Sequence, residues 1–189
     1  MRSTSSASFS LTSRSPPDAG SLPRRFALDQ NFPEPIVDGL ADWLAPDAEL
    51  VPIRRIDARM ATLDDWEVLA ALHADETDWD GLITTDAKML SLPRELALLS
   101  QTKLTLVAAE AVGHDPIKAT GLVLAHLGRI CEQTRPDIAQ VWRLRTSTKP
   151  ADDPWDYLTT VAERRGSDAR TLYASERLSK RQLLRSPLD

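Results

Sequence analysis

The sequence predicts an α/β fold of three layers, in which helices cover both faces of a mainly parallel central sheet. Short apolar runs typical of buried strands alternate with amphipathic helical segments along most of the 189 residues. The hydrophobic content of 42% is sufficient for a core, and the length predicts one domain with tails. Because parallel strands need crossover connections, this alternation predicts βαβ units.

Three strands and two helices are predicted in the first half of the chain. The apolar runs 25–29, 50–53 and 81–86 are the strands, and the segments 33–44 and 63–73 carry apolar residues at helical spacing. A proline inside the second run favours an edge position, since proline cannot donate a hydrogen bond to a neighbouring strand. Two of the three strands end in an aspartate.

The second half adds two strands and three helices. The run 104–108 is the clearest buried strand of the chain, and 139–144 alternates like a last strand. Helices are predicted at 93–99, 116–133 and 154–164. Each of them begins with proline, which suits the first helical position because its missing N–H would have no partner there.

The domain boundaries follow from composition. Residues 1–23 are rich in Ser, Thr and Pro without hydrophobic periodicity and are predicted to be a disordered tail. Residues 24–165 form the predicted folded α/β domain. Residues 166–189 are a basic C-terminal tail with a thin apolar stripe that is compatible with a helix. We expect this tail to be mobile or to dock on a partner.

Composition excludes several classes of protein. The only cysteine, Cys131, rules out an intramolecular disulfide and a zinc site built on paired cysteines. No apolar run is long enough to cross a membrane, and no secretory signal is visible, so a cytoplasmic protein is expected. Glycine-rich phosphate loops are absent. Residues 26–115 contain six basic and 18 acidic residues, an imbalance that repels nucleic acid unless a cation neutralises part of it.

Aspartates recur where ligand sites form in parallel sheets, beyond the carboxyl ends of the strands. Asp29 follows the first strand, Asp86 follows the third, and Asp64 and Asp65 open the helix between them. Carboxylates that converge repel one another. A divalent cation such as Mg²⁺, which prefers oxygen ligands, neutralises this repulsion. The recurrence of acids at these positions favours a metal site.

Each of these acids also has a purely structural interpretation. Asp64 with Glu67 has the form of a capping box, and Asp65 would then lie in the first helical turn, where the helix dipole favours an acid. Asp29 and Asp86 can cap helices or form turns. Asp115, followed by proline, matches a helix N-cap.

The motifs together carry a resemblance to a known family. The segments FALDQNFP at 26–33, LDDWEVL at 63–69 and GLITTD at 81–86 resemble, in order and spacing, the small bacterial "LDxNxP" branch of the PIN-like superfamily. Many members are VapC-type toxins, ribonucleases that use Mg²⁺ or Mn²⁺. The resemblance implies a PIN-like fold over about residues 25–145. It also implies a metal-dependent endoribonuclease whose substrate is RNA. An antitoxin or another protein partner, and a homodimer, are compatible with the resemblance.

Carried over by position, the resemblance places Asp29, Asp65 and Asp86 in the catalytic metal cluster, with Asn31 beside the first. Asn31, Asp64 and Asp115 are weaker candidates as ligands. The sequence departs from the family where a further acid often follows the third aspartate, because Lys88 stands there. Asp64, Glu110 or Asp115 could make up that deficit.

Two alternatives to a nuclease stay open. Lys88 and the acidic body are compatible with a PIN-like module that binds partners without cutting. A receiver-like phosphoacceptor domain also sets acids after parallel strands. It needs adjacent acids after the first strand, however, and Gln30 follows Asp29 here.

Overall fold

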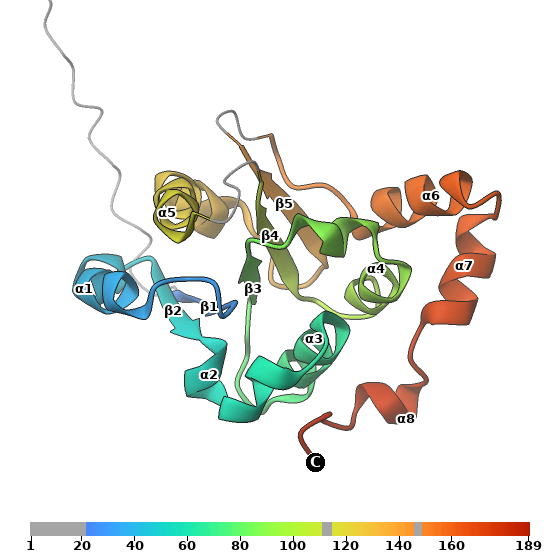
Figure 1. The fold of residues 1–189 in the computed structure, drawn as a ribbon, viewed down its shortest axis with the longest axis horizontal. Helices are drawn as coiled ribbons and strands as arrows, with labels where there is room; N and C mark the ends of the chain where they lie inside the picture. Colours follow the sequence, from blue (N-terminus) through green and yellow to red (C-terminus); the bar gives the residue numbers. More distant parts are fainter. Residues whose placement is uncertain (1–21, 111–114, 146–148) are drawn as a thin grey trace, which may run out of the picture.

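A single parallel sheet forms the centre of the computed structural model, which describes residues 22–110, 115–145 and 149–189. Its strands are β1 (Arg24–Leu28), β2 (Ala48–Pro52), β3 (Gly81–Thr84), β4 (Thr105–Ala109) and β5 (Gln140–Leu144). Their spatial order is β2-β1-β3-β4-β5, and every neighbouring pair is parallel. The α/β class with a parallel sheet is therefore confirmed. Strand β2 lies at the edge, as Pro52 predicted (Figure 1).

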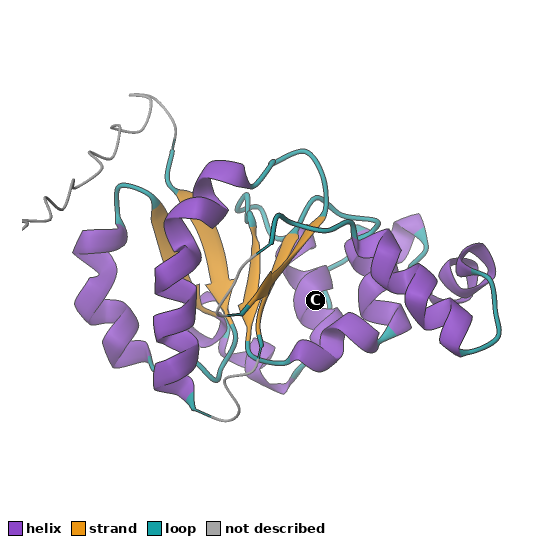
Figure 2. Ribbon diagram, turned by 90° about the horizontal axis from the view of Figure 1, so that it is seen from above, coloured by secondary structure: helices purple, strands orange, loops and turns teal. Residues whose placement is uncertain are grey.

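Helices cover both faces of this sheet (Figure 2). They are α1 (Glu34–Leu44), α2 (Ile53–Ile56), α3 (Asp65–Ala74), α4 (Pro93–Leu99), α5 (Pro116–Gln133), α6 (Pro154–Arg164), α7 (Ala169–Glu176) and α8 (Lys180–Leu183), with 3₁₀ turns η1 (Ala58–Thr62) and η2 (Ala87–Ser91). Helices α4, α5 and α6 begin and end at the predicted residues, each with proline in its first turn. None of the helices in the described part of the chain has the length and apolar character that a membrane span requires.

Alternation along the strands divides the core into two clusters. Phe26, Leu28 and Ile83 pack on one face with residues of α1 and α5. Ala27 and Leu82 point to the other face and pack with residues of α3 and α4. Because successive side chains of a strand point to opposite faces, a sheet with helices on both sides needs apolar residues at every position, which explains the continuous apolar runs.

The C-terminal segment differs from the expected mobile or partner-docked tail. Helices α7 and α8 pack against the domain itself, and Leu172 and Leu178 are only 8% and 4% exposed. The side chain of Gln101 exchanges two hydrogen bonds of 2.8 Å with the backbone of Leu178. The few leucines of the thin apolar stripe are thus sufficient to dock the segment. The predicted N-terminal tail lies, up to residue 21, outside the described residues.

Candidate active site

The strand order reverses beside β1, and this reversal marks the expected position of a ligand site. Strand β1 has β2 on one side and β3 on the other. In doubly wound sheets, ligands bind in the crevice outside the carboxyl ends of the strands at this switch point. Asp29 directly follows β1 and Asp86 follows β3 by one intervening residue, while the backbone N–H of Asp29 donates to the carbonyl of Ile83 at 3.0 Å. Two of the predicted acids therefore lie at the switch point.

A single buried hydroxyl connects these two acids. Thr84, the last residue of β3, is 2% exposed. Its Oγ1 donates to Asp29 Oδ2 at 2.7 Å and accepts the backbone N–H of Asp86 at 2.9 Å. Thr84 therefore sets the position of the first acid relative to the second. Sequence reasoning missed this role, although a polar residue inside an apolar run is a signal for it.

Further donors hold the Asp29 carboxylate in place. Asn31 donates its backbone N–H to Oδ1 at 2.9 Å and its side-chain Nδ2 to Oδ2 at 3.1 Å. The backbone N–H of Thr85 approaches Oδ2 at 3.4 Å. Asn31 thus lies beside Asp29, where the family resemblance put it. These bonds occupy Oδ2 and leave a lone pair of Oδ1 available, since an ionised carboxylate offers about four acceptor sites.

Asp65 joins the same site from a third segment. It is the first residue of α3 and is half-buried. Burial raises its pKa, and the charges of Asp86, Asp29 and Asp64 raise it further. Within the described residues, no hydrogen bond or ion pair reaches its carboxylate. The charges of Asp29 and Asp86 thus act on Asp65, and in the described part of the chain no basic side chain pairs with any of the three.

Three of the other predicted acids have structural partners. Asp64 is the N-cap of α3, and its backbone N–H donates to the Glu67 carboxylate at 2.9 Å, as a capping box predicts. Asp115 caps α5 by accepting the backbone N–H groups that follow it, both at 3.1 Å. Glu110 is held by two arginines at 2.7 and 2.6 Å. Glu110 is therefore held by arginines, and the second oxygen of Asp115 lies 3.4 Å from Lys118 Nζ, so neither acid is free to replace the one missing at Lys88.

Asp86 combines a capping role with its place in the site. Its side chain accepts the backbone N–H of Lys88 at 2.8 Å and so begins the turn η2. Lys88 itself is exposed. A cap uses one carboxylate oxygen and leaves the other free, so capping and ligand binding are compatible at Asp86.

Sequence reasoning also missed Glu95. This residue of α4 is 8% exposed, and burial together with the charge of Asp65 raises its pKa. Its neighbour Arg94 stacks over the ring of Trp66, with 4.5 Å between the guanidinium carbon and the ring centroid. The available signal was an acid in the first turn of α4, directly before the apolar run that completes the helix. Glu95 adds a further carboxyl group next to Asp65.

The donor set fits a divalent cation in its chemistry. Carboxylate oxygens are the ligands that Mg²⁺ and Mn²⁺ prefer, and a cation would relieve the repulsion that raises the pKa of Asp65. As the side chains stand, however, no group of three or more His, Cys, Asp or Glu residues in the described segments is arranged to hold a metal. The predicted cluster is therefore not a ready-made cage in the described segments.

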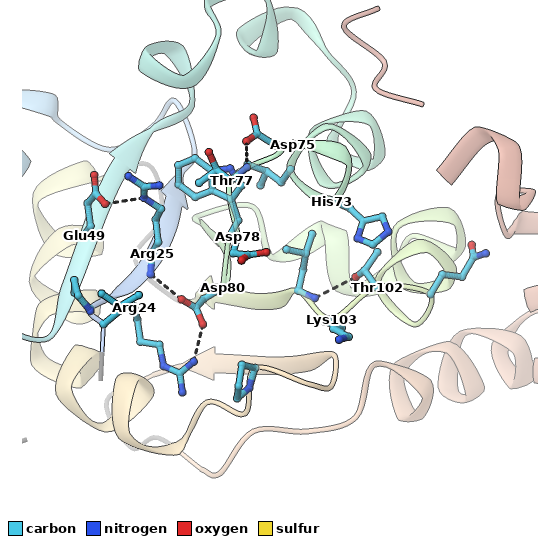
Figure 3. A pocket seen from close by; sticks show the side chains of 17 residues that line it. Arg24, Arg25, Glu49, His73, Asp75, Thr77, Asp78, Asp80, Thr102 and Lys103 are labelled. Carbon is cyan, nitrogen blue, oxygen red and sulfur yellow. Dashed lines mark hydrogen bonds and ion pairs between the residues drawn. The ribbon is translucent and has the colours of Figure 1, made fainter. Parts of the chain in front are cut away.

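A separate pocket lies at the opposite edge of the sheet. It measures about 1040 Å³ and is lined by residues that precede or begin the strands (Figure 3). Its arginines are paired, Arg24 with Asp80 and Arg25 with Glu49, both at 2.7 Å. None of the predicted acids lines it. Because ligand sites of parallel sheets form at the carboxyl ends, the acidic residues at the switch point are the stronger candidate.

Fold and site together define the class of this protein as a doubly wound α/β domain with an acidic site at the β1–β3 switch point. In comparisons with known proteins, no protein family, curated protein or solved structure matches the chain. The function is therefore argued from the site alone.

Proposed function

We propose that the protein is a metal-dependent ribonuclease that hydrolyses RNA phosphodiesters with a metal-activated water. The supporting observation is that the charges of Asp29 and Asp86 act on Asp65, although the three acids come from three separate segments, and that they have no basic partner in the described structure. A pKa raised by burial and by like charges is common at functional sites and is costly for a purely structural carboxylate. The PIN-like resemblance names the same three residues.

The residues of the chain divide into ligands and positioning groups. Asp29 and Asp86 would hold the ion, and Asp65 would ligate it or hold one of its waters. Thr84 and Asn31 fix the Asp29 carboxylate through hydrogen bonds, as partners of metal ligands commonly do. When bound, Mg²⁺ or Mn²⁺ supplies positive charge opposite the phosphate and lowers the pKa of a coordinated water.

The same ion reconciles an acidic protein with an anionic substrate. The chain has a net charge of −5, and its acids concentrate in the segment that carries the site. RNA would be repelled from such a surface, but a bound divalent cation reverses the local sign. Binding of RNA near the acids should therefore depend on the metal.

The decisive experiment is cleavage of a labelled single-stranded RNA with Mn²⁺ by Asp29→Asn and Asp86→Asn variants. We expect each variant to lose cleavage by about a hundredfold or more while staying folded, because each change removes a direct ligand. Asp42→Asn, an exposed charge change on α1, is the matched control and should retain full activity. Undiminished cleavage by Asp29→Asn from a nuclease-free preparation would show that the assignment is wrong.

One observation favours a non-catalytic interaction module. The exposed Lys88 lies next to Asp86 and could occupy the place of a cation. Calorimetric titration with Mn²⁺ distinguishes the ribonuclease from the non-catalytic interaction module, because the ribonuclease must bind the ion and the interaction module need not. An antitoxin partner and a homodimer stay predictions.

The strand order favours a second alternative, the receiver-like domain, because it is the flavodoxin-like order that receiver domains share. Against it, Gln30 rather than an acid follows Asp29, and the acid after β4, Glu110, is held by two arginines. Labelling by acetyl phosphate would support a phosphoacceptor.

A further inference from the structure

A second pocket adjoins the candidate active site. It measures about 260 Å³ and lies between η2 and α6. Its wall begins at Ala87, the residue after Asp86, and includes Arg143 of β5 and Arg164 at the end of α6. The remaining lining residues are Leu90, Ser91, Glu110, Tyr157, Thr160 and Val161. The wall of the pocket therefore begins one residue after the proposed ligand Asp86.

Arg143 is held rigidly at this pocket. Its Nε and Nη2 donate to the two oxygens of Glu110 at 2.7 and 3.0 Å, and Arg145 Nε donates to the same carboxylate at 2.6 Å. Burial alone would raise the pKa of Glu110, but the hydrogen bonds from Arg143 and Arg145 outweigh it and lower the pKa. Glu110 is thus shared by two arginines, and its bonds to Arg143 use Nε and Nη2 but not Nη1.

Arg164 adds a second cation without a counter-charge. Its side chain is exposed, and in the described part of the chain it makes no hydrogen bond or ion pair. Tyr157, the other titratable group of the lining, stays neutral because burial raises its pKa, and its hydroxyl donates to Asp152 at 2.7 Å. In a chain of net charge −5, this pocket is thus a locally positive site beside an acidic one.

We propose that this pocket binds a backbone phosphate of single-stranded RNA next to the phosphodiester that is cleaved. The inference rests on the proposed ribonuclease function. Guanidinium groups recognise phosphate oxygens through paired N–H donors, and Arg143 is already oriented by Glu110, so little side-chain entropy is lost on binding. Arg164 closes the site from α6. A phosphate held here would direct the strand across η2 towards Asp86.

Binding of RNA without cleavage tests the pocket directly. In EDTA, which removes the metal-dependent contribution of the acids and leaves that of the pocket, fluorescence anisotropy is measured with a labelled twelve-nucleotide single-stranded RNA. It compares Arg164→Glu with Arg181→Glu, an equal change of charge at an exposed site on α8. We expect Arg164→Glu to weaken binding by about tenfold relative to the control. The slope of affinity against salt should shrink by about 0.7, the value of one phosphate contact on a single strand. Equal affinities and slopes for the two variants would overturn the proposal.

A second variant covers the case in which Arg164 has a structural role. Thr160→Asp adds a negative charge to the exposed lining and leaves both arginines in place, so it should weaken RNA binding in the same way. With Mn²⁺ present, Arg164→Glu should raise KM and leave kcat nearly unchanged, since the pocket holds substrate away from the reacting atoms. Weaker RNA binding by both variants in a protein that does not cleave would support the pocket and reject the nuclease. Normal RNA binding by both variants, together with intact cleavage, would reject the pocket and support the nuclease.

Discussion

The hydroxyl of Thr84 is hydrogen-bonded to the carboxylate of Asp29, with 2.7 Å between Oγ1 and Oδ2, and it also accepts the backbone N–H of Asp86. Two neighbouring strands thus share one buried polar atom where the chain reverses its winding direction. A hydroxyl in this position uses both its donor and its acceptor capacity, so it fixes two acids at once. The position of the acidic site therefore depends on Thr84 as much as on the acids.

Replacing this hydroxyl should damage both stability and activity. Thr84→Val keeps the shape but leaves the Asp86 N–H without its partner and removes one of the donors to Asp29 Oδ2, which costs about 1–3 kcal/mol. Cleavage of RNA should fall by about 10- to 100-fold, as for other groups that orient metal ligands. Thr84→Ser keeps the hydroxyl and should retain most of the stability and most of the cleavage activity. Denaturant unfolding and cleavage assays measure the two effects, and full activity in Thr84→Val would contradict the positioning role.

The charge of Asp65 should make stability depend on pH. Burial, with Asp86 and Asp29 next, raises its pKa above the ordinary value of 3.8. A carboxyl group whose pKa rises on folding stabilises the folded state fully below the unfolded pKa, and this contribution is lost as pH rises through the folded pKa. Asp65→Asn should therefore raise the melting temperature at neutral pH and bring no gain below the ordinary pKa.

Solvent screening of the half-exposed Asp65 keeps this gain small, at about 2 °C. Thermal melts of wild type, Asp65→Asn and the control Asp42→Asn across the acidic and neutral range provide the measurement. A lower melting temperature of Asp65→Asn at neutral pH would show that the Asp65 charge is compensated and would remove the main support for the site.

Gly81 should tolerate no side chain. A Cβ at this position would collide with the backbone of Thr105, because β3 and β4 approach each other closely at the start of β3. Gly81→Ala should cost about 2–3 kcal/mol, since the obstacle is backbone and cannot move aside. Gly121 of α5 has open space around it, so Gly121→Ala should stabilise the protein by up to about 1 kcal/mol. Urea unfolding of both variants measures the contrast; similar effects would disprove the close approach.

The C-terminal segment should contribute to stability as part of the domain. Leu178 is 4% exposed, whereas Leu184 is 82% exposed. Leu178→Ala should lower the free energy of unfolding by about 2–4 kcal/mol through lost burial and a cavity, and Leu184→Ala by less than about 0.5 kcal/mol. Chemical denaturation measures the free energy of unfolding of both variants, and limited proteolysis measures how accessible the C-terminal segment is. Equal effects of the two variants would restore the expectation of a mobile tail.

Local patterns in the sequence were sufficient to predict the five strands and the helices α1, α3, α4, α5 and α6, but not α2 or the 3₁₀ turns. Apolar runs predicted the strands, and proline at helix starts predicted where α4, α5 and α6 begin. The caps at Asp64 and Asp115 were also visible, because a cap and the N–H groups that it binds lie within a few residues. Acids after β1 and β3 predicted a site at the carboxyl edge of the sheet.

Tertiary structure alone decided how these pieces meet. The order β2-β1-β3 puts Asp29 beside Asp86, the fold brings Glu95 next to Asp65, and Glu110 is taken by arginines rather than by the site. Such relationships join residues that are dozens of positions apart. Hydrophobic periodicity and capping report only on neighbours within a turn or a strand, so they carry no information about which distant segment a side chain will face.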